Sequence, residues 1–361
     1  MTGTRVTQIR LTNQLLSASR ERTPSDIIKH LGAVQAQDYS GGEWSIGLRQ
    51  PGSKLAHVEK EILEGKIVRT WALRGTLHFL AGADARWILE LLAPGLIAGL
   101  ARRYKELGLD QAMFRKTNSI LASALKGNKH LTRGELKAII EKNRISCEGQ
   151  RMTFMLHRAS LDRVICFGIT RGKQQTHALF DEWVPEKRAM DREEALAELA
   201  LRYFTSHGPA TIQDYMWWSG LSAADALAGL EMVKSRLTKL GIGSKDLWGP
   251  VTKPFPEPTS PVVYLLPPFD DFLLGYKDRS ASIDNTVSAR LRTGGMPEAT
   301  IILDGKVTGA WNRKLKRDGI TIETRTFRKL NSKEEKALQS AVNRYAEFVG
   351  RKSEWRVQAP R

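Results

Sequence analysis

The chain has 361 residues, 41% hydrophobic and 26% charged side chains, a formal net charge of +17 and a pI near 9.9. This composition is typical of globular proteins and argues against long-range disorder, while the length predicts two or three domains. A surface this basic attracts polyanions and releases them as salt rises, so nucleic acid is the leading class of partner. A solvated basic surface without a ligand is the alternative.

Cysteine and histidine are too few and too scattered for a disulfide framework or a metal site. Cys147 and Cys166 are the two cysteines, and the seven histidines include no close pair at metal-ligand spacing. We therefore expect no metal, no cofactor and a reducing compartment. The first ten residues lack an apolar signal core, and residues 88–100 are too short to span a bilayer. The expectation is a cytoplasmic, nucleoid-associated monomer with no membrane contact and no obligatory protein partner.

Three helical segments followed by a hairpin are predicted in the first hundred residues. Thr23-Pro24 supplies a cap and a helix-start proline for the second of them. The expected helices are 6–17, 27–31 and 56–64, and the expected strands are 67–71 and 76–80, on either side of Arg74-Gly75. Helices followed by a hairpin are the order of a winged helix.

The same order of elements recurs along the chain. The second unit has expected helices at 117–125, 136–142 and 152–161 and strands at 164–169 and 176–180, with a basic hairpin tip at Arg171 to Gln174. The third unit has expected helices at 192–204, 212–218 and 222–237. Tandem winged-helix domains are the economical interpretation.

A proline-rich linker, residues 250–261, precedes a C-terminal part that contains strands. The expected strands are 262–266, 300–303, 306–311 and 320–327, with Asp304-Gly305 as a hairpin turn, and a closing helix is expected at 333–349. The predicted fold class is therefore α+β and helix-rich. Three domains are expected: 1–112; 113–188, with 15 basic and seven acidic side chains; and 189–361, which includes the C-terminal strands and helix.

The tripeptide Gln35-Ala36-Gln37 places two neutral amides in a basic protein. On a helix the two side chains would diverge by roughly 200°, whereas in an extended or turning segment they share a face. The neighbouring Gly32 and the Gly41-Gly42 pair favour irregular or helix-end geometry, which lets both amides converge on one ligand atom. The alternative is a polar recognition helix whose glutamines contact adenine or phosphate.

A second constellation runs from Arg69 to His78. Arg74, Gly75 and Thr76 offer a guanidinium, a flexible backbone and a hydroxyl, which together suit a phosphate. His78 is placed to hydrogen-bond near a substrate. The alternative is that the aromatic and aliphatic neighbours are hairpin core and that His78 is a satisfied core histidine.

An acidic pair, Asp270-Asp271, adjoins an apolar run and is the third constellation. One of the two carboxylates could be buried and act as a base, a metal ligand or a partner of Arg279. A structural salt bridge or a turn cap is the stronger interpretation. We interpret the Trp217-Trp218 pair as core residues; a base-stacking platform is the less favoured alternative.

Four motifs, in this order along the chain, resemble the AlkZ/YcaQ-like family of winged-helix DNA glycosylases. They are Val34-Gln35-Ala36-Gln37, Trp71-Ala72-Leu73-Arg74-Gly75-Thr76-Leu77-His78, Leu265 to Tyr276 and Asp304 to Trp311. The resemblance covers essentially the whole chain. It implies tandem winged-helix domains that form a concave surface for double-stranded DNA, and excision of alkylated bases, with crosslink unhooking in some members.

The resemblance also assigns roles to residues of this chain. The catalytic motif of the family is glutamine, an apolar residue, then glutamine or aspartate, and Gln35 and Gln37 fill its outer places. Because the second place is Gln37, the chain looks closer to the AlkZ-type branch, and broad crosslink activity is in doubt. Candidate contacts to DNA or substrate are Arg69, Arg74, Thr76, His78, Arg171 and Lys173.

The neutral amides of Gln35 and Gln37 suit a substrate base that already carries positive charge. An N7-alkylated guanine carries positive charge, so its glycosidic bond breaks without a strong acid, and the enzyme needs to position water and stabilise the sugar cation. The expected activity is that of a monofunctional DNA glycosylase acting on alkylated bases in double-stranded DNA. The alternative is a non-catalytic winged-helix transcriptional regulator that prefers one undamaged sequence. An RNA-binding module is least favoured, since an aromatic sheet signature is lacking.

Overall fold

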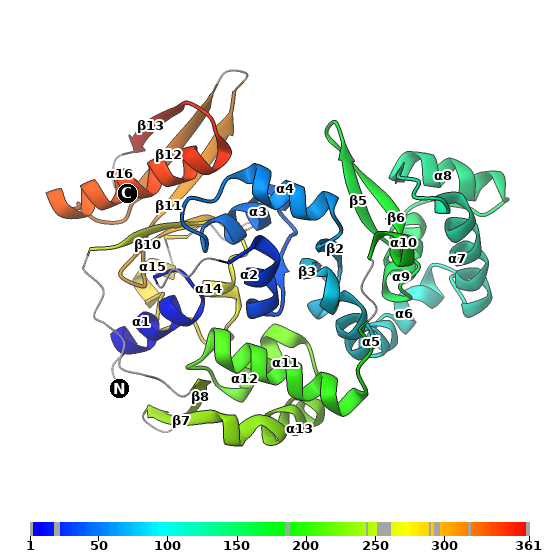
Figure 1. Cartoon of the computed structure of the whole chain (residues 1–361), viewed down its shortest axis with the longest axis horizontal. Coiled ribbons are helices and arrows are strands. Elements are labelled where there is room, and N and C mark those ends of the chain that lie inside the picture. Colours follow the sequence, from blue (N-terminus) through cyan, green and yellow to red (C-terminus); the bar gives the residue numbers. More distant parts are fainter. Residues whose placement is uncertain are drawn as a thin grey trace.

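The computed structural model describes residues 3–17, 22–184, 188–242, 245–250, 261–288, 290–291, 297–316 and 319–358. Helices dominate, and two β arms, one containing β5 and β6 and the other β11 to β13, rise from a largely helical body (Figure 1). The helix-rich α+β class predicted from the sequence is confirmed.

The first unit contains a short strand between its first two helices. Its elements are α2 (Pro24–Leu31), β1 (Val34–Gln35), α3 (Tyr39–Gly47), α4 (Leu55–Leu63), β2 (Ile67–Trp71), the 3-10 turn η1 (Leu73–Gly75) and β3 (Leu77–Ala81). Thr23 caps α2 as expected, through a reciprocal pair of hydrogen bonds with Asp26. The short strand β1 pairs with β3, the second strand of the hairpin.

The second and third units repeat this order. The second consists of α7 (Gln111–Leu125), β4 (Leu131–Thr132), α8 (Arg133–Lys142), α9 (Arg151–Leu161), β5 (Ile165–Arg171), β6 (Gln174–Leu179) and α10 (Phe180–Trp183). The third consists of α11 (Arg192–His207), α12 (Ile212–Ser219), α13 (Ala223–Val233), η2 (Lys234–Arg236), β7 (Leu237–Ile242) and β8 (Lys245–Pro250). In each, a short segment after the first helix pairs with the second hairpin strand: β4 with β6, and Ala210 with Trp248 of β8.

The first two units share one sheet. Its strand order is β1-β3-β2-β5-β6-β4, and the two halves meet at the pair Arg69 and Phe167. The helices α5 (Gly82–Gly99) and α6 (Ala101–Glu106) connect the halves along the chain. This junction brings the second hairpin beside the residues of the first.

The C-terminal part forms a separate five-stranded sheet. Its strands are β9 (Val263–Leu266), β10 (Ala299–Leu303), β11 (Lys306–Leu315), β12 (Ile320–Thr326) and β13 (Ser353–Gln358), in the order β13-β12-β11-β10-β9. The helices are α14 (Asp271–Leu274), α15 (Asn285–Ser288) and α16 (Ser332–Val349), and α1 (Gly3–Asn13) lies against the β10–β11 turn. The turn at Asp304-Gly305 is confirmed, and Gly305 has a φ of +85°, which favours glycine.

The C-terminal sheet and the first unit are packed around one apolar core. Trp44 of α3 contacts the rings of Tyr345 and Phe348 on α16, at centroid distances of 4.9 and 5.1 Å. Its indole nitrogen also donates to the carbonyl oxygen of Leu265, at 2.7 Å. The third unit packs instead against the first hairpin and α5, and the second unit has a core of its own. The segment that carries Gln35 thus lies between the apolar core shared with the C-terminal sheet and the apolar core shared with the third unit.

Two of the differences from the sequence prediction concern the glycine pair and the third unit. The Gly41-Gly42 pair predicts irregular geometry, yet both glycines lie inside α3, where a Cβ on Gly42 would be 2.8 Å from the ring of Phe79. Close packing against β3 therefore requires Gly42, whereas a Cβ on Gly41 would be 2.7 Å from the Asp38 carboxylate, and neither glycine ends a helix. The third hairpin, β7–β8, replaces the end of the helix predicted over 222–237, because α13 stops at Val233. Most of the predicted proline-rich linker, residues 251–260, lies outside the described residues.

In the part of the chain that the structure describes, we find no helix with the length and apolar character needed to cross a lipid bilayer.

Candidate functional site

The Gln35-Ala36-Gln37 segment runs from the short strand β1 into a bend, after the end of α2 at Gly32. Gln35 ends β1 opposite His78 of β3, and the Ala36 N–H donates to the carbonyl oxygen of Leu77 at 2.8 Å. The side chain of Gln35 is 8% exposed, whereas Gln37 is exposed at the bend that precedes α3. One amide is therefore built into the protein, and the other is available to a ligand.

Arg69 of β2 holds the backbone of this segment from across β3, which lies between β1 and β2. Its Nε and Nη2 donate to the Ala36 carbonyl oxygen at 3.1 and 2.9 Å, and the guanidinium lies 4.7 Å from the centre of the Phe167 ring. Burial lowers the pKa of Arg69 to about 10, so the guanidinium remains charged at neutral pH. With 8% of the residue exposed, Arg69 is placed to position Ala36 and not to present an open phosphate contact.

Arg74 contacts the Gln35 side chain directly. Its Nη2 donates to the Gln35 Oε1 at 3.3 Å, and its Nη1 donates to the main-chain carbonyl of Trp218 in the third unit. The residue occupies the left-handed region with a φ of 55°, followed by Gly75 at 71°, which turns the guanidinium back toward β1. Arg74 thus ties one catalytic candidate to the third unit and leaves the second lone pair of the Gln35 oxygen for another donor.

Thr76 and His78 are occupied by local hydrogen bonds. The Thr76 hydroxyl donates to the Leu73 carbonyl at 3.2 Å, and the His78 Nδ1 lies 3.0 Å from the Thr76 carbonyl. His78 is 2% exposed, and burial together with the charge of Arg74 lowers its pKa to about 4. Its imidazole is neutral at pH 7, so it supplies no proton to a leaving group at that pH.

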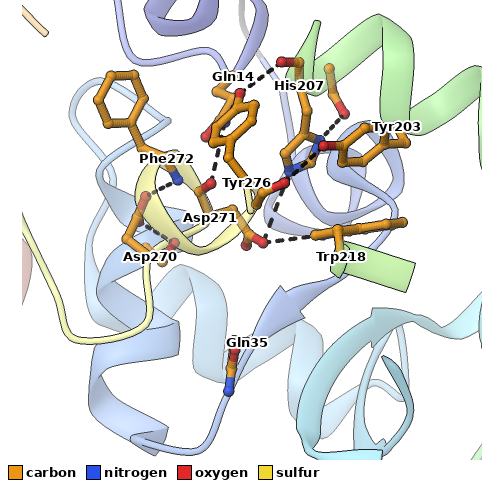
Figure 2. Close-up of polar contacts among 12 residues, drawn as sticks. Gln14, Gln35, Tyr203, His207, Trp218, Asp270, Asp271, Phe272 and Tyr276 are labelled. Carbon is orange, nitrogen blue, oxygen red and sulfur yellow. Dashed lines mark hydrogen bonds and ion pairs between the residues drawn. The ribbon is translucent and has the colours of Figure 1, made fainter. Parts of the chain in front are cut away.

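The acidic pair lies beside this segment, and both carboxylates are buried (Figure 2). Asp270 accepts from both terminal nitrogens of Arg49 at 2.8 Å, from the Ser45 hydroxyl at 2.7 Å and from the Phe272 N–H at 2.9 Å. Although burial raises the pKa of Asp270, Arg49 outweighs it and holds that pKa below the ordinary value. The partner is thus Arg49 and not Arg279, and the salt-bridge and cap interpretations are both confirmed.

Asp271 has far fewer partners. Its Oδ1 accepts from the Trp218 indole nitrogen at 3.3 Å and lies 3.9 Å from the His207 Nε2, which is too far for a hydrogen bond (Figure 2). Burial lowers the pKa of His207, which is therefore neutral at pH 7. Among the described residues, the Asp271 Oδ2 has no hydrogen-bond partner. The charge of Asp271 acts on Arg74, whose pKa burial lowers and this carboxylate raises.

Comparison with known proteins shows the family of the chain. A family model described as DNA glycosylase AlkZ-like matches residues 28–348. The chain belongs to this family. An interstrand DNA cross-link repair glycosylase from Streptomyces sahachiroi is 27% identical over 323 residues, which cover 84% of this chain and 85% of that protein. The solved structure of Streptomyces sahachiroi DNA glycosylase AlkZ matches 99% of both chains with a TM-score of 0.78 and 23% identity, which shows a common fold. The resemblance read from the four motifs is confirmed.

The second hairpin presents the remaining predicted DNA contacts to one side of this family fold. Arg171 and Lys173 are both exposed at its tip. Arg171 is also paired with Glu135 at 3.0 Å and donates to the main-chain carbonyl of His130. Lys173 follows Gly172, whose φ of 61° makes the tight turn of the hairpin. The structure thus brings Gln35, Arg69, Arg74 and His78 together, whereas Arg171 contacts Glu135 and His130.

Sequence reasoning missed Arg49, Trp218 and His207 as parts of the surroundings of the site. Arg49 reaches Asp270 across 221 positions of the chain, and Trp218 reaches Asp271 across 53. Pairings this distant have no local signal. The Trp217-Trp218 prediction holds for Trp218, which is 1% exposed, but not for Trp217, which is 43% exposed. Trp217 and Trp218 lie on different faces of α12, and the helical spacing of apolar residues along 212–219 is the sequence signal that could have distinguished them.

A third carboxyl lies close to the motif. Glu43 of α3 is 4% exposed, and burial, with the charge of Glu59 nearby, raises its pKa to about 8. It is therefore mainly protonated at neutral pH. The helix α3 thus places a neutral carboxylic acid, and not an anion, on its buried face.

Proposed function

We propose that this protein is a monofunctional DNA glycosylase that hydrolyses the N-glycosidic bond of cationic, N7-alkylguanine-type bases in double-stranded DNA. The observation that carries the proposal is the pinned Gln35-Ala36-Gln37 segment. Arg69 holds its central carbonyl, Arg74 orients its first amide, and its second amide is exposed. Such an arrangement fixes neutral oxygen acceptors in space without reorganisation during the reaction.

The two amides are suited to positioning the attacking water. The Gln35 oxygen accepts from Arg74 and retains a second lone pair, while the Gln37 amide is exposed and open to a water. Water held between them attacks the anomeric carbon as the sugar develops oxocarbenium character, and the two amide dipoles stabilise that charge.

The protonation states around the motif favour a leaving group that is already charged. His78 is neutral at pH 7, and Arg69 and Arg74 are guanidinium cations that do not release protons in this range. The protonated Glu43 is on the buried face of α3, 4% exposed. An N7-alkylated guanine departs without protonation, whereas an undamaged base requires an acid. The enzyme would then select damaged bases in two ways: by binding them, and because their glycosidic bond breaks without an acid.

We extend the proposal to interstrand crosslinks. The relative from Streptomyces sahachiroi, which matches 84% of this chain, bears the name of a crosslink repair glycosylase. A crosslink joined through a cationic purine has the same kind of leaving group as a simple adduct. The exposed position of Gln37 offers room for a bulky substituent.

We also propose that the three repeated units are winged-helix domains, with bounds of 1–112, 113–188 and 189–361, and that the protein binds duplex DNA as a monomer. The order of helix, short strand, two helices and hairpin in each unit supports this interpretation. The basic second domain would supply phosphate contacts through its hairpin tip, where Lys173 is exposed.

The test uses a duplex that carries a single N7-methylguanine, incubated with protein and then cleaved with alkali. We expect strand breaks well above the uncatalysed rate, and a loss of about 10²-fold in the single-turnover excision rate for Gln35→Ala or Gln37→Ala. Both variants should retain DNA affinity within about threefold, because the amides make no net charge contribution to phosphate binding.

The matched control is Gln339→Ala on α16, which removes a glutamine that bonds only to Asn343 in the described structure. It should excise at the wild-type rate. Absence of excision by the wild-type protein, combined with strong preference for one undamaged sequence in a selection from random DNA, would instead support the regulator.

A further inference from the structure

A pocket of about 390 Å³ opens where the first and second units meet in the shared sheet. Ligand pockets typically span roughly 300–1,000 Å³, so this one has the size of a small-molecule site. It is lined by Trp71 of β2, by the start of α8 and by residues of β5 and β6. The lining residues are Trp71, Thr132, Arg133, Gly134, Phe167, Gln174, Gln175 and His177.

Aromatic rings from three neighbouring strands form one side of the pocket. The Trp71 and Phe167 ring centres are 5.1 Å apart, and those of Phe167 and His177 are 4.8 Å apart. Trp71 and Phe167 are only partly buried, so both retain surface that faces the pocket. Aromatic surfaces left partly open in this way are typical of sites that stack planar ligands.

The polar groups of the pocket suit the edge of a base. Gln174 is exposed, and its amide offers both a donor and an acceptor. Gln175 is partly exposed; its Oε1 accepts from Arg69 and its Nε2 donates to the Thr170 hydroxyl at 3.0 Å, which leaves one lone pair and one N–H of the amide for a ligand. His177 is 3% exposed, and in the described part of the chain neither of its ring nitrogens has a hydrogen-bond partner. The lining contains one cation, Arg133, and no carboxylate. The pocket therefore does not repel a ligand attached to phosphate.

Arg69 links this pocket to the glutamine segment. Its guanidinium stacks over Phe167 at 4.7 Å, and its Nη1 donates to the Gln175 Oε1 at 3.4 Å. The same side chain donates twice to the Ala36 carbonyl oxygen. The Arg69 side chain thus lies between the pocket and the segment that carries Gln35 and Gln37. A single bound duplex could therefore contact the pocket and the glutamine segment at the same time.

We propose that this pocket receives one unstacked nucleobase of the bound DNA, stacked on Trp71 and Phe167 and hydrogen-bonded by Gln174 or Gln175. The inference rests on the proposed function, since it assumes that the protein binds DNA. Its test does not require glycosylase activity. The ligand chemistry is a planar base with hydrogen-bonding edges, and its source is either the damaged base itself or the base opposite it. Stacking on aromatic side chains is the usual way in which proteins hold bases outside the helix.

The first experiment measures binding to undamaged duplexes by fluorescence anisotropy. One duplex has a single-adenine bulge, and the second has an abasic residue in place of that adenine. We expect the wild-type protein to bind the adenine bulge about 5- to 100-fold more tightly than the abasic bulge. Trp71→Ala should remove the difference without weakening binding to the abasic bulge, and Trp71→Phe should restore most of it.

Two further variants keep this test independent of folding. Gln174 is exposed at the mouth of the pocket, so Gln174→Ala should fold normally and reduce the preference about 2- to 10-fold. Trp217→Ala removes an exposed indole outside the pocket and should leave the preference unchanged. Equal wild-type affinity for the two bulges, or full preference in both Trp71→Ala and Gln174→Ala, would overturn the inference.

A second experiment identifies the source of the base. N7-methylguanine is placed opposite either cytosine or an abasic residue, and excision by Trp71→Ala is compared with that of the wild type. If the pocket holds the opposite base, the variant is slow only opposite cytosine; if it holds the lesion, the variant is slow on both duplexes. Equal rates for variant and wild type on both duplexes would contradict a base in the pocket. Because the bulge assay needs no excision, a failed glycosylase activity and a failed base pocket give different results.

Discussion

Asp270 and Asp271 are adjacent in the chain and both buried, yet their surroundings are opposite. Asp270 is enclosed by Arg49, Ser45 and the Phe272 N–H, so its charge is fully compensated. Asp271 has one indole donor, a neutral histidine at 3.9 Å and an oxygen without a partner among the described residues. The first carboxylate stabilises the scaffold between α3 and α14. The second retains an electrostatic influence on Arg74, and through it on Gln35.

The largest expected effect is a difference in the free energy of unfolding between variants of Asp270 and Asp271. Asp270→Asn leaves the buried Arg49 charge uncompensated and should lower the free energy of unfolding by about 3–5 kcal/mol. Asp271→Asn removes a poorly compensated buried charge and should change that free energy by about 1 kcal/mol or less. Urea denaturation of the two variants at pH 7 makes the comparison. Equal losses would show that Asp271 is as much a part of the scaffold as Asp270.

Glu43 extends the comparison to a buried carboxyl that, among the described residues, accepts no hydrogen bond from a cation. Its pKa is about 8 in the folded protein against 4.5 for the ordinary group. Below pH 4.5 both states hold the proton, whereas between pH 4.5 and 8 the unfolded chain releases it and the folded protein retains it. The free energy of unfolding therefore falls as pH rises through this range and levels off above pH 8.

Glu43→Gln should remove this dependence and stabilise the protein at pH 8 by about 4 kcal/mol relative to its effect at pH 4.5. Denaturation of both proteins at several pH values between 4.5 and 8.5 measures it. The matched control is Glu335→Gln on the exposed side of α16, for which no such trend is expected. A variant that follows the wild-type pH profile would show that Glu43 is ionised in the folded protein.

Arg69 and Arg49 are both buried guanidiniums, but Arg49 meets a carboxylate and Arg69 meets a carbonyl oxygen. Arg69→Lys keeps the charge and loses the paired donation to Ala36, so the glutamine segment becomes less well held. We expect the single-turnover excision rate to fall about 10-fold with DNA affinity changed by about threefold or less. A fall in affinity with an unchanged excision rate would assign Arg69 to phosphate binding, as the sequence first suggested.

The smallest effects are expected at the hairpin tip, far from either carboxylate. Lys173→Gln should lower duplex affinity only about 2- to 5-fold and reduce the slope of log affinity against log salt by about one unit. Arg171→Gln should change that slope less, because Glu135 already neutralises part of its charge. Titrations at several salt concentrations test both variants. A larger change of slope for Arg171→Gln would mean that DNA displaces Glu135.

The sequence predicted much of the fold because the signals were local. The cap at Thr23, the hairpin around Gly172 and the turn at Asp304-Gly305 each depend on residues a few positions apart, and all three are confirmed. Helix α3 was missed because the requirement for Gly42 arises from Phe79 on another strand. The same limit applies to the site: the non-helical form of Gln35-Ala36-Gln37 could be predicted locally, but its anchoring by Arg69 and Arg74 depends on strand pairing and on Trp218 in the third unit.

The meeting of Arg69 with Phe167 has a mechanical consequence. The sheets of the first and second units join at this pair, and the same guanidinium holds the Ala36 carbonyl. If the second hairpin binds the duplex as proposed, a displacement of the hairpin reaches the glutamine segment through this guanidinium. We therefore expect the grip on the DNA backbone and the alignment of the two amides to change together, so that correct seating of the duplex sets the moment of bond cleavage.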